Sequence, residues 1–198
     1  MHRRHLLGAG ALALSCLSLV SPVWAANAAE DFVSASILKG FDLLNDTSVS
    51  AAERRQRFAT FLLGLTDVRR VALFLLGSYA AKADAADIDA YVAAYRDYIM
   101  SVYQSYFSLY AGQSLRVVSS RERAPGDYVV STQITGGNAA TAIDFRVRTD
   151  GERPLLLDVA VSGVWLALAQ RDQFMSVLAA NNGDVKILTS HLRNITHA

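Results

Sequence analysis

The chain has 198 residues, 52% of them apolar, and its 19 Lys and Arg nearly balance its 18 Asp and Glu, for a formal net charge of +1. A chain of this length builds one domain with a sizeable core. The even charge balance excludes the basic field that nucleic-acid binding needs, so we expect no nucleic-acid partner.

The first 25 residues have the form of a secretory signal peptide. Arg3 and Arg4 precede an uncharged apolar run that ends in small residues at Ala25. The run is shorter than the roughly 20 residues that a membrane-spanning helix needs. We therefore expect residues 1–25 to be removed after export and residues 26–198 to form a single domain. The Arg3-Arg4 pair resembles a weak twin-arginine signal, so both the general and the twin-arginine export routes stay open.

The mature chain offers few groups for catalysis. Cleavage removes Cys16, the only cysteine, and the two remaining histidines, His191 and His197, lie near the C-terminus. Zinc sites need clusters of such ligands, and the chain also lacks phosphate-loop, dinucleotide and nucleophile-elbow motifs. The carboxylates within residues 84–89 suit the positive end of a helix that begins there. We expect no metal, no cofactor and no enzymatic activity.

The order of the sequence patterns predicts an α+β fold, with a helical half at about residues 30–111 followed by a strand-rich half. A first helix ends at Asn45-Asp46. Ser50 and Glu53 form a capping box that begins a second helix, which runs to about Gly64. Asp67 caps a third helix. Apolar residues at helical spacing on that third helix are Val68, Val71, Leu75 and Tyr79.

A fourth helix, from Ala85 to about Tyr110, contains no Gly or Pro. Five of its residues fall on one face. They are Tyr91, Tyr95, Tyr98, Val102 and Tyr106. Two interpretations of this stripe stay open: core residues whose hydroxyls reach the surface, or one wall of a ligand pocket.

The second half alternates with the period of a half-buried sheet. The apolar positions are Leu115, Val117, Val130, Ile134, Ile143, Phe145, Val147, Leu155, Leu157, Val159 and Val161. Turn residues at 124–127, 136–138 and 150–152 predict an antiparallel meander of about four strands, with one face covered by helices. Two short helices should follow, at residues 171–180 and from about residue 185 to 192, separated by Asn181-Asn182-Gly183.

Three stretches resemble the MlaC / toluene-tolerance family, also called Tgt-type auxiliary components of lipid transport. Residues 67–79 contain an acid, an apolar helical run and Leu-Gly followed by an aromatic residue. Residues 91–113 resemble the family's aromatic helix, and residues 157–174, with the Gln170-Arg171 pair, are the most specific match and are similar to the HpnM branch. Ser162 and Trp165 depart from the family pattern, where Glu and Ser are usual.

The resemblance implies a periplasmic carrier in which helices and a curved sheet enclose an apolar pocket. Its cargo would be a phospholipid, which it would carry between an outer-membrane lipoprotein complex and an inner-membrane ABC transporter. The HpnM-like features leave a second cargo open, a hopanoid or another terpenoid lipid. An enzyme that uses the tyrosine stripe or Asp144 is a further alternative.

We expect the lipid to contact residues from the helical stripe, the sheet face and the segment after the last long strand. These residues are Val71, Leu75, Tyr79, Tyr98, Val102, Tyr106, Val117, Phe145, Val159, Val161 and Trp165. All but Tyr79, Val117 and Trp165 should line one continuous cavity. Residues 45–49 and 163–170 are the connections expected to move when the lipid enters.

Overall fold

The computed structural model describes residues 27–107, 112–135 and 141–196. The expected signal peptide, the turn at residues 136–138 and His197 lie outside these ranges. The elements in chain order are α1 (Ala28–Asn45), α2 (Ala51–Gly64), α3 (Val68–Leu76), the 3₁₀ helix η1 (Gly77–Ala81), α4 (Ala85–Phe107), β1 (Ser114–Ala124), β2 (Asp127–Thr135), β3 (Ala142–Arg148), β4 (Leu155–Val161), β5 (Val164–Trp165), α5 (Leu166–Ala180) and α6 (Val185–Thr196). The predicted α+β fold is confirmed.

The helix starts follow the local caps that the sequence provides. The Ser50 hydroxyl accepts a hydrogen bond from the backbone N–H of Glu53, and the Asp67 carboxylate accepts one from the backbone N–H of Arg70. The third helix is shorter than expected. It ends at Leu76 because Gly77 has a φ of +54°, outside the right-handed helical region. Tyr79 therefore belongs to η1.

The sheet is an antiparallel meander in the order β1-β2-β3-β4-β5. The four expected strands are present, and a fifth of two residues pairs Trp165 with Ala160. Ser162 and Gly163 turn the chain between β4 and β5 with φ values of +51° and +83°. Positive φ at both central residues is typical of the tight hairpin turns that match strand twist.

A β-bulge shifts the side-chain alternation of β4. Val147 lies opposite Leu156, whereas the preceding residue of β3 lies opposite Asp158, so Leu157 is an extra residue in the strand. Leu156 consequently takes the sheet face of Val147. The strict alternation expected from the sequence, with Leu155 and Leu157 on the apolar face, is therefore wrong at the start of β4.

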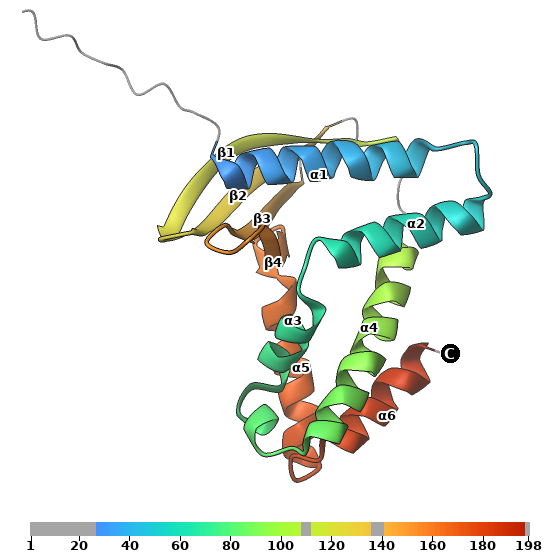
Figure 1. Ribbon diagram of the computed structural model, residues 1–198, viewed down its shortest axis with the longest axis vertical. Coiled ribbons are helices and arrows are strands. Elements are labelled where there is room, and N and C mark those ends of the chain that lie inside the picture. The colour runs from blue at the N-terminus through green and yellow to red at the C-terminus, as the bar shows by residue number, and fades with distance from the viewer. Residues whose placement is uncertain (1–26, 108–111, 136–140, 197–198) are drawn as a thin grey trace, which may run out of the picture.

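The buried residues form two separate clusters, and Figure 1 shows the corresponding two-part arrangement. In one part α1 lies along the sheet, and Val33, Val130 and Val147 are buried between them. In the other part α3, α4, α5 and α6 form a helical bundle around Leu75 and Leu188, both with 0% exposure. The space that positions the candidate site lies where these two parts meet.

Within the described residues, no helix combines the length and the apolar character that crossing a membrane requires. The same part of the chain also contains no group of three or more His, Cys, Asp and Glu placed to hold a metal ion.

Candidate functional site

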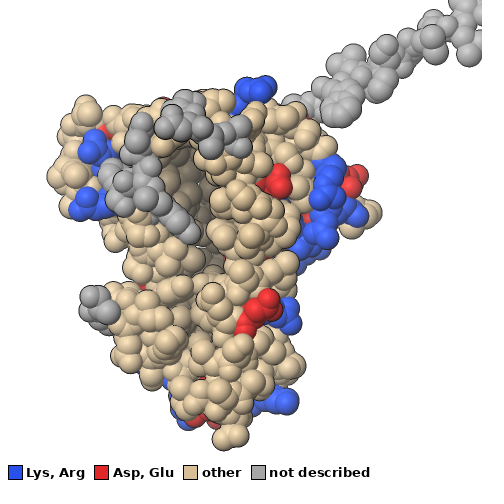
Figure 2. Space-filling model, turned by 180° about the vertical axis from the view of Figure 1, so that it is seen from behind, with Lys and Arg blue, Asp and Glu red and all other residues tan. Residues whose placement is uncertain are grey.

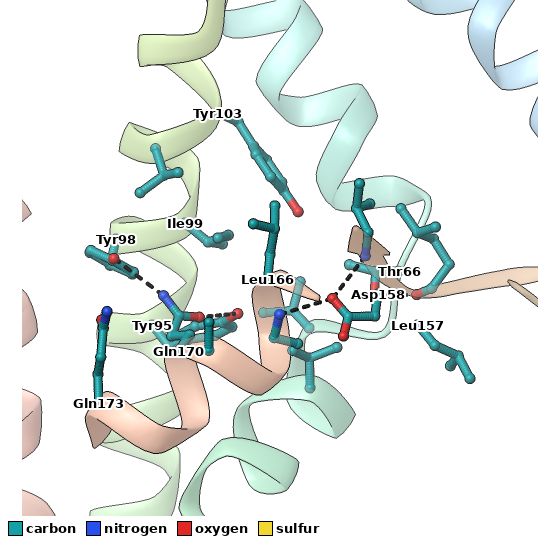
Figure 3. Close-up of a pocket in the computed structure, with 17 residues that line it drawn as sticks. Thr66, Tyr95, Tyr98, Ile99, Tyr103, Leu157, Asp158, Leu166, Gln170 and Gln173 are labelled. Carbon is teal, nitrogen blue, oxygen red and sulfur yellow. Dashed lines mark hydrogen bonds between the residues drawn. The ribbon is translucent and has the colours of Figure 1, made fainter. Parts of the chain in front are cut away.

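A pocket of about 340 Å³ lies between α4, strand β4 and the first turns of α5. We call it the α4–β4 pocket. Figure 3 shows that side chains from α4 and α5 and from β4 face one another across it. Its lining residues are Thr66, Val68, Val71, Tyr95, Tyr98, Ile99, Val102, Tyr103, Leu156, Leu157, Asp158, Val159, Leu166, Ala167, Ala169, Gln170 and Gln173.

Four of the residues expected from the sequence line this pocket together. Val71 comes from α3, Tyr98 and Val102 come from the α4 stripe, and Val159 comes from β4. The expected meeting of the helical stripe with the sheet thus occurs across this pocket. Contact of these side chains with lipid stays a prediction.

The other expected residues lie elsewhere. Leu75 is fully buried in the helical bundle, and Tyr79 packs against the same cluster. Val117 and Phe145 pack against the core between α1 and the sheet. Val161 is 38% exposed. None of these five lines the α4–β4 pocket.

The remaining two expected positions are Trp165 and Tyr106. Trp165 forms β5 together with Val164, and the two residues that follow it, Leu166 and Ala167, line the pocket. Tyr106 belongs to α4, but its side chain lies outside the described part of the structure.

Sequence reasoning missed the contribution of α5 to the pocket. The predicted helix began at Arg171, whereas α5 begins at Leu166, so Leu166 and Gln170 became helical wall residues. The cause is tertiary. The Asp158 carboxylate on β4 accepts the backbone N–H of Ala167 at 2.8 Å and thereby caps the helix. No residue next to α5 in the sequence signals this cap.

The polar groups of the pocket largely satisfy one another. The Tyr95 hydroxyl donates to Oε1 of Gln170 at 3.2 Å, and Nε2 of Gln170 donates to the Tyr98 hydroxyl at 3.2 Å (Figure 3). Burial raises the pKa of Tyr95 further above the ordinary phenol value. Its hydroxyl therefore stays neutral at physiological pH and cannot serve as a general base.

Asp158 is the single carboxylate among the described lining residues. Burial raises its pKa, and hydrogen bonds from the backbone N–H groups of Ala167 and Val159, each at 2.8 Å, oppose that rise. The carboxylate is thus engaged in capping α5. Asp144, the other carboxylate considered for chemistry, lies on β3 opposite Ala160 and is not among the lining residues.

A second pocket, of about 160 Å³, lies between α1, α2 and the sheet, and we call it the α1–α2 pocket. No charged side chain is among its described lining residues. They are Phe32, Val33, Ser36, Ile37, Gly40, Phe41, Leu44, Phe58, Phe61, Leu62, Leu65, Leu115, Phe145 and Leu156. Phe145 is the expected site residue that it contains. The single cavity expected from the sequence is therefore divided into two pockets.

The surface near these pockets is poor in charge. Viewed from behind, the molecule has a deep hollow at about the height where its two parts meet, and the visible surface around it is mostly uncharged (Figure 2). An apolar concave surface with a few fixed polar groups is typical of sites for lipids and other small apolar molecules.

Comparison with known proteins identifies the fold and the family of the chain. One solved structure with a similar fold is that of a phospholipid-binding protein from Ralstonia solanacearum in complex with a phospholipid. It superimposes with a TM-score of 0.69 over 86% of this chain and 95% of that chain, at 17% sequence identity. At this identity the likeness establishes the fold. The family model for the MlaC protein matches residues 37–194, most of the sequence. The chain therefore belongs to the MlaC family.

Proposed function

We propose that the mature protein binds a phospholipid and buries an acyl chain of it in the α4–β4 pocket. The protein then carries this lipid, chemically unchanged, through the periplasm. The observation that carries this proposal is the pocket itself, whose lining is mainly apolar and in which Tyr95, Gln170 and Tyr98 bond to one another. Membership of the MlaC family supports it, as does the fold shared with a protein described as phospholipid-binding.

The volume of the pocket suits a lipid chain. An apolar cavity of about 150 Å³ accommodates benzene, so about 340 Å³ accommodates roughly a dozen chain carbons. Burial of each CH₂ contributes about 0.8 kcal/mol, which gives roughly 10 kcal/mol before the cost of association is subtracted. A gross gain of this size is comparable to the cost of association, so burial of the chain supplies the main driving force for binding.

The geometry gives little support to an enzyme. Catalysis by a tyrosine or a carboxylate needs a group with a free proton acceptor or donor near the substrate. Tyr95 is held neutral and is bonded to Gln170, and Asp158 caps α5. A binding protein needs no such reactive pair.

The proposed partners, export route and cargo alternative rest on the resemblance to the MlaC family. The partners would be an inner-membrane ABC lipid transporter and an outer-membrane lipoprotein complex, between which the protein moves. Export would use the expected signal peptide at residues 1–25. The cargo alternative is a hopanoid or other terpenoid lipid, which the HpnM-like residues around Gln170-Arg171 favour.

The test is to identify the lipid that accompanies the exported protein. The full chain is expressed with its own leader, purified from the periplasm without detergent and extracted, and the extract is analysed by mass spectrometry. Diacyl phospholipid in near-stoichiometric amount is the expected result. Polycyclic lipid would support the alternative cargo. Absence of lipid, together with no uptake from phosphatidylglycerol vesicles, would contradict the proposal.

A pair of variants assigns the lipid to the pocket. Val102→Asp places a charge on the wall of the α4–β4 pocket and should abolish the bound lipid, because a carboxylate among acyl carbons is costly. Leu38→Asp makes the same kind of change on α1, where the residue is 68% exposed, and should leave the lipid content unchanged.

A further inference from the structure

Leu156 is the one residue that the α4–β4 pocket and the α1–α2 pocket have in common among their described linings. Its position on the wall of both pockets makes it the boundary between them. The β-bulge at Leu157 puts it there, because without that extra residue Leu156 would point to the opposite face of the sheet.

The boundary is held in place by the connection between α2 and α3. The backbone N–H of Leu156 donates to the carbonyl oxygen of Leu65 at 2.8 Å, and the Thr66 hydroxyl donates to the carbonyl oxygen of Leu156 at 2.8 Å. Leu65 lines the α1–α2 pocket, whereas Thr66 lines the α4–β4 pocket. Leu65, Thr66 and Leu156 thus form a bonded divider with one pocket on each side.

The two volumes limit what each side can accept. The α4–β4 pocket accommodates roughly a dozen carbons and the α1–α2 pocket, at about 160 Å³, roughly six. The first volume is too small for two long acyl chains. The α1–α2 pocket is apolar, with no charged residue in its described lining. Water therefore finds few hydrogen-bond partners there, whereas the end of an acyl chain is stabilised by burial.

We propose that a bound diacyl lipid places the end of one acyl chain in each pocket and that Leu156 keeps the two chains apart. Leu156 would then be a specificity-determining residue, since it favours a cargo with two separate chains over a single rigid ring system. The inference rests on the proposed function, because it requires that the protein bind lipid at all.

Photo-crosslinking tests the assignment directly. Delipidated full-length protein is loaded with phosphatidylglycerol that carries a diazirine at the end of either its first or its second chain, and the labelled residues are mapped by mass spectrometry. In the wild type, one isomer should label the α4–β4 pocket, for example Tyr103, and the other should label the α1–α2 pocket, for example Phe58 or Phe61. Labelling of the α4–β4 pocket alone by both isomers would overturn the proposal.

A change at Leu156 tests its role as the divider. In Leu156→Ala each isomer should label both pockets. Leu188→Ala removes the same atoms from the helical bundle, away from both linings, and should keep the wild-type pattern. An unchanged labelling pattern in a folded Leu156→Ala protein would show that Leu156 does not separate the chains.

Filling the α1–α2 pocket from its α1 side gives a second measurement. A Cβ atom at Gly40 would lie 3.7 Å from the rings of Phe58 and Phe61, so a side chain starts without a clash and extends into the pocket. Gly40→Leu should weaken binding of palmitoyl-oleoyl phosphatidylglycerol at least tenfold and that of one-chain palmitoyl lysophosphatidylglycerol less than twofold. Gly64→Leu, which lines neither apolar pocket and meets no atom within 4 Å, is the control.

The outcomes separate this inference from the proposed function. If the two lipids lose affinity equally in Gly40→Leu, or if neither does, the second chain does not occupy the α1–α2 pocket, although lipid binding stands. If the wild-type protein binds neither lipid, the proposed function itself fails.

Discussion

Asp158 of β4 caps α5 from across a turn of the chain: its carboxylate accepts the backbone N–H of Ala167 at 2.8 Å. Trp165, the residue at the N-cap position of α5, has no side-chain oxygen and makes no capping bond. Strand β4 and the start of α5 are therefore joined by one carboxylate that also lines the α4–β4 pocket.

This arrangement predicts how stability depends on pH. Burial raises the pKa of Asp158 in the folded protein above the ordinary value of 3.8. The folded state then binds the proton more tightly than the unfolded state, so the stability contributed by this group is full below pH 3.8 and is lost as the pH rises through the raised pKa. In Asp158→Asn, which keeps an acceptor oxygen, that loss should disappear. The measurement is the free energy of unfolding in denaturant, for both proteins, from acid to neutral pH. A constant difference between the two proteins would contradict it.

Asp127 gives the opposite prediction. Its two carboxylate oxygens accept hydrogen bonds from Nε and Nη2 of Arg146 at 3.0 and 2.7 Å. These hydrogen bonds lower the pKa of Asp127. Because the pKa of Asp127 is lower in the folded state, this group stabilises the protein above pH 3.8. That stabilisation is lost as the pH falls through the lowered pKa. Asp127→Asn should therefore lose on the order of 1 kcal/mol at neutral pH, since Arg146 is partly exposed, and less in acid. A deficit that grows in acid would show that the ion pair is not the cause.

The sequence was sufficient to predict those parts of the fold that local patterns determine. Ser50 and Asp67 cap the helices that they were expected to cap, and strands β1 to β4 form the expected meander. The stripe on α4 was also recognised, but its parts have different surroundings. Tyr91 is fully buried in the helical bundle, whereas Tyr98 and Val102 line the α4–β4 pocket. Periodicity identifies a face of a helix and cannot say whether that face meets side chains or a pocket.

The features that divide the pockets could not be predicted, because each depends on a distant partner. The bulge that orients Leu156 is a property of the pairing between β3 and β4. The early start of α5 depends on Asp158, which lies nine residues before the N–H that it accepts. Single-sequence patterns carry no register and no long-range capping, so the alternation in β4 and the start of α5 were both misplaced.

Leu75 and Val102 distinguish a core position from a pocket position. Leu75 has 0% exposure within the bundle, so Leu75→Ala should cost about 2–5 kcal/mol of stability with no change in the lipid bound by the folded protein. Val102 borders the α4–β4 pocket, so Val102→Ala leaves a smaller new void and should cost less, while it lowers lipid affinity. Thermal melting and extracted lipid are measured on both variants. If the two variants lose stability and bound lipid in the same proportion, Leu75 and Val102 do not differ as core and pocket positions.

Trp165 departs from the family pattern and lies near the start of residues 163–170, the segment expected to move. It pairs with Ala160 in the short β4–β5 hairpin and directly precedes Leu166 and Ala167 on the pocket wall. Its side chain is only partly buried. We therefore expect Trp165→Ala to change lipid affinity or cargo more than it changes the melting temperature. Truncation of a fully packed indole would instead cost about 3–5 kcal/mol.

Phe174→Ala provides the matched comparison for Trp165→Ala. Phe174 is 5% exposed and packs against the rings of Tyr95 and Tyr98, so its truncation should lower the melting temperature strongly, by the mechanism of a core cavity. If Trp165→Ala melts as low as Phe174→Ala, and the refolded protein retains the wild-type lipids in wild-type amounts, Trp165 is a core residue. A small change in melting temperature together with altered lipid content would show that Trp165 affects cargo binding, through the wall residues Leu166 and Ala167 that follow it.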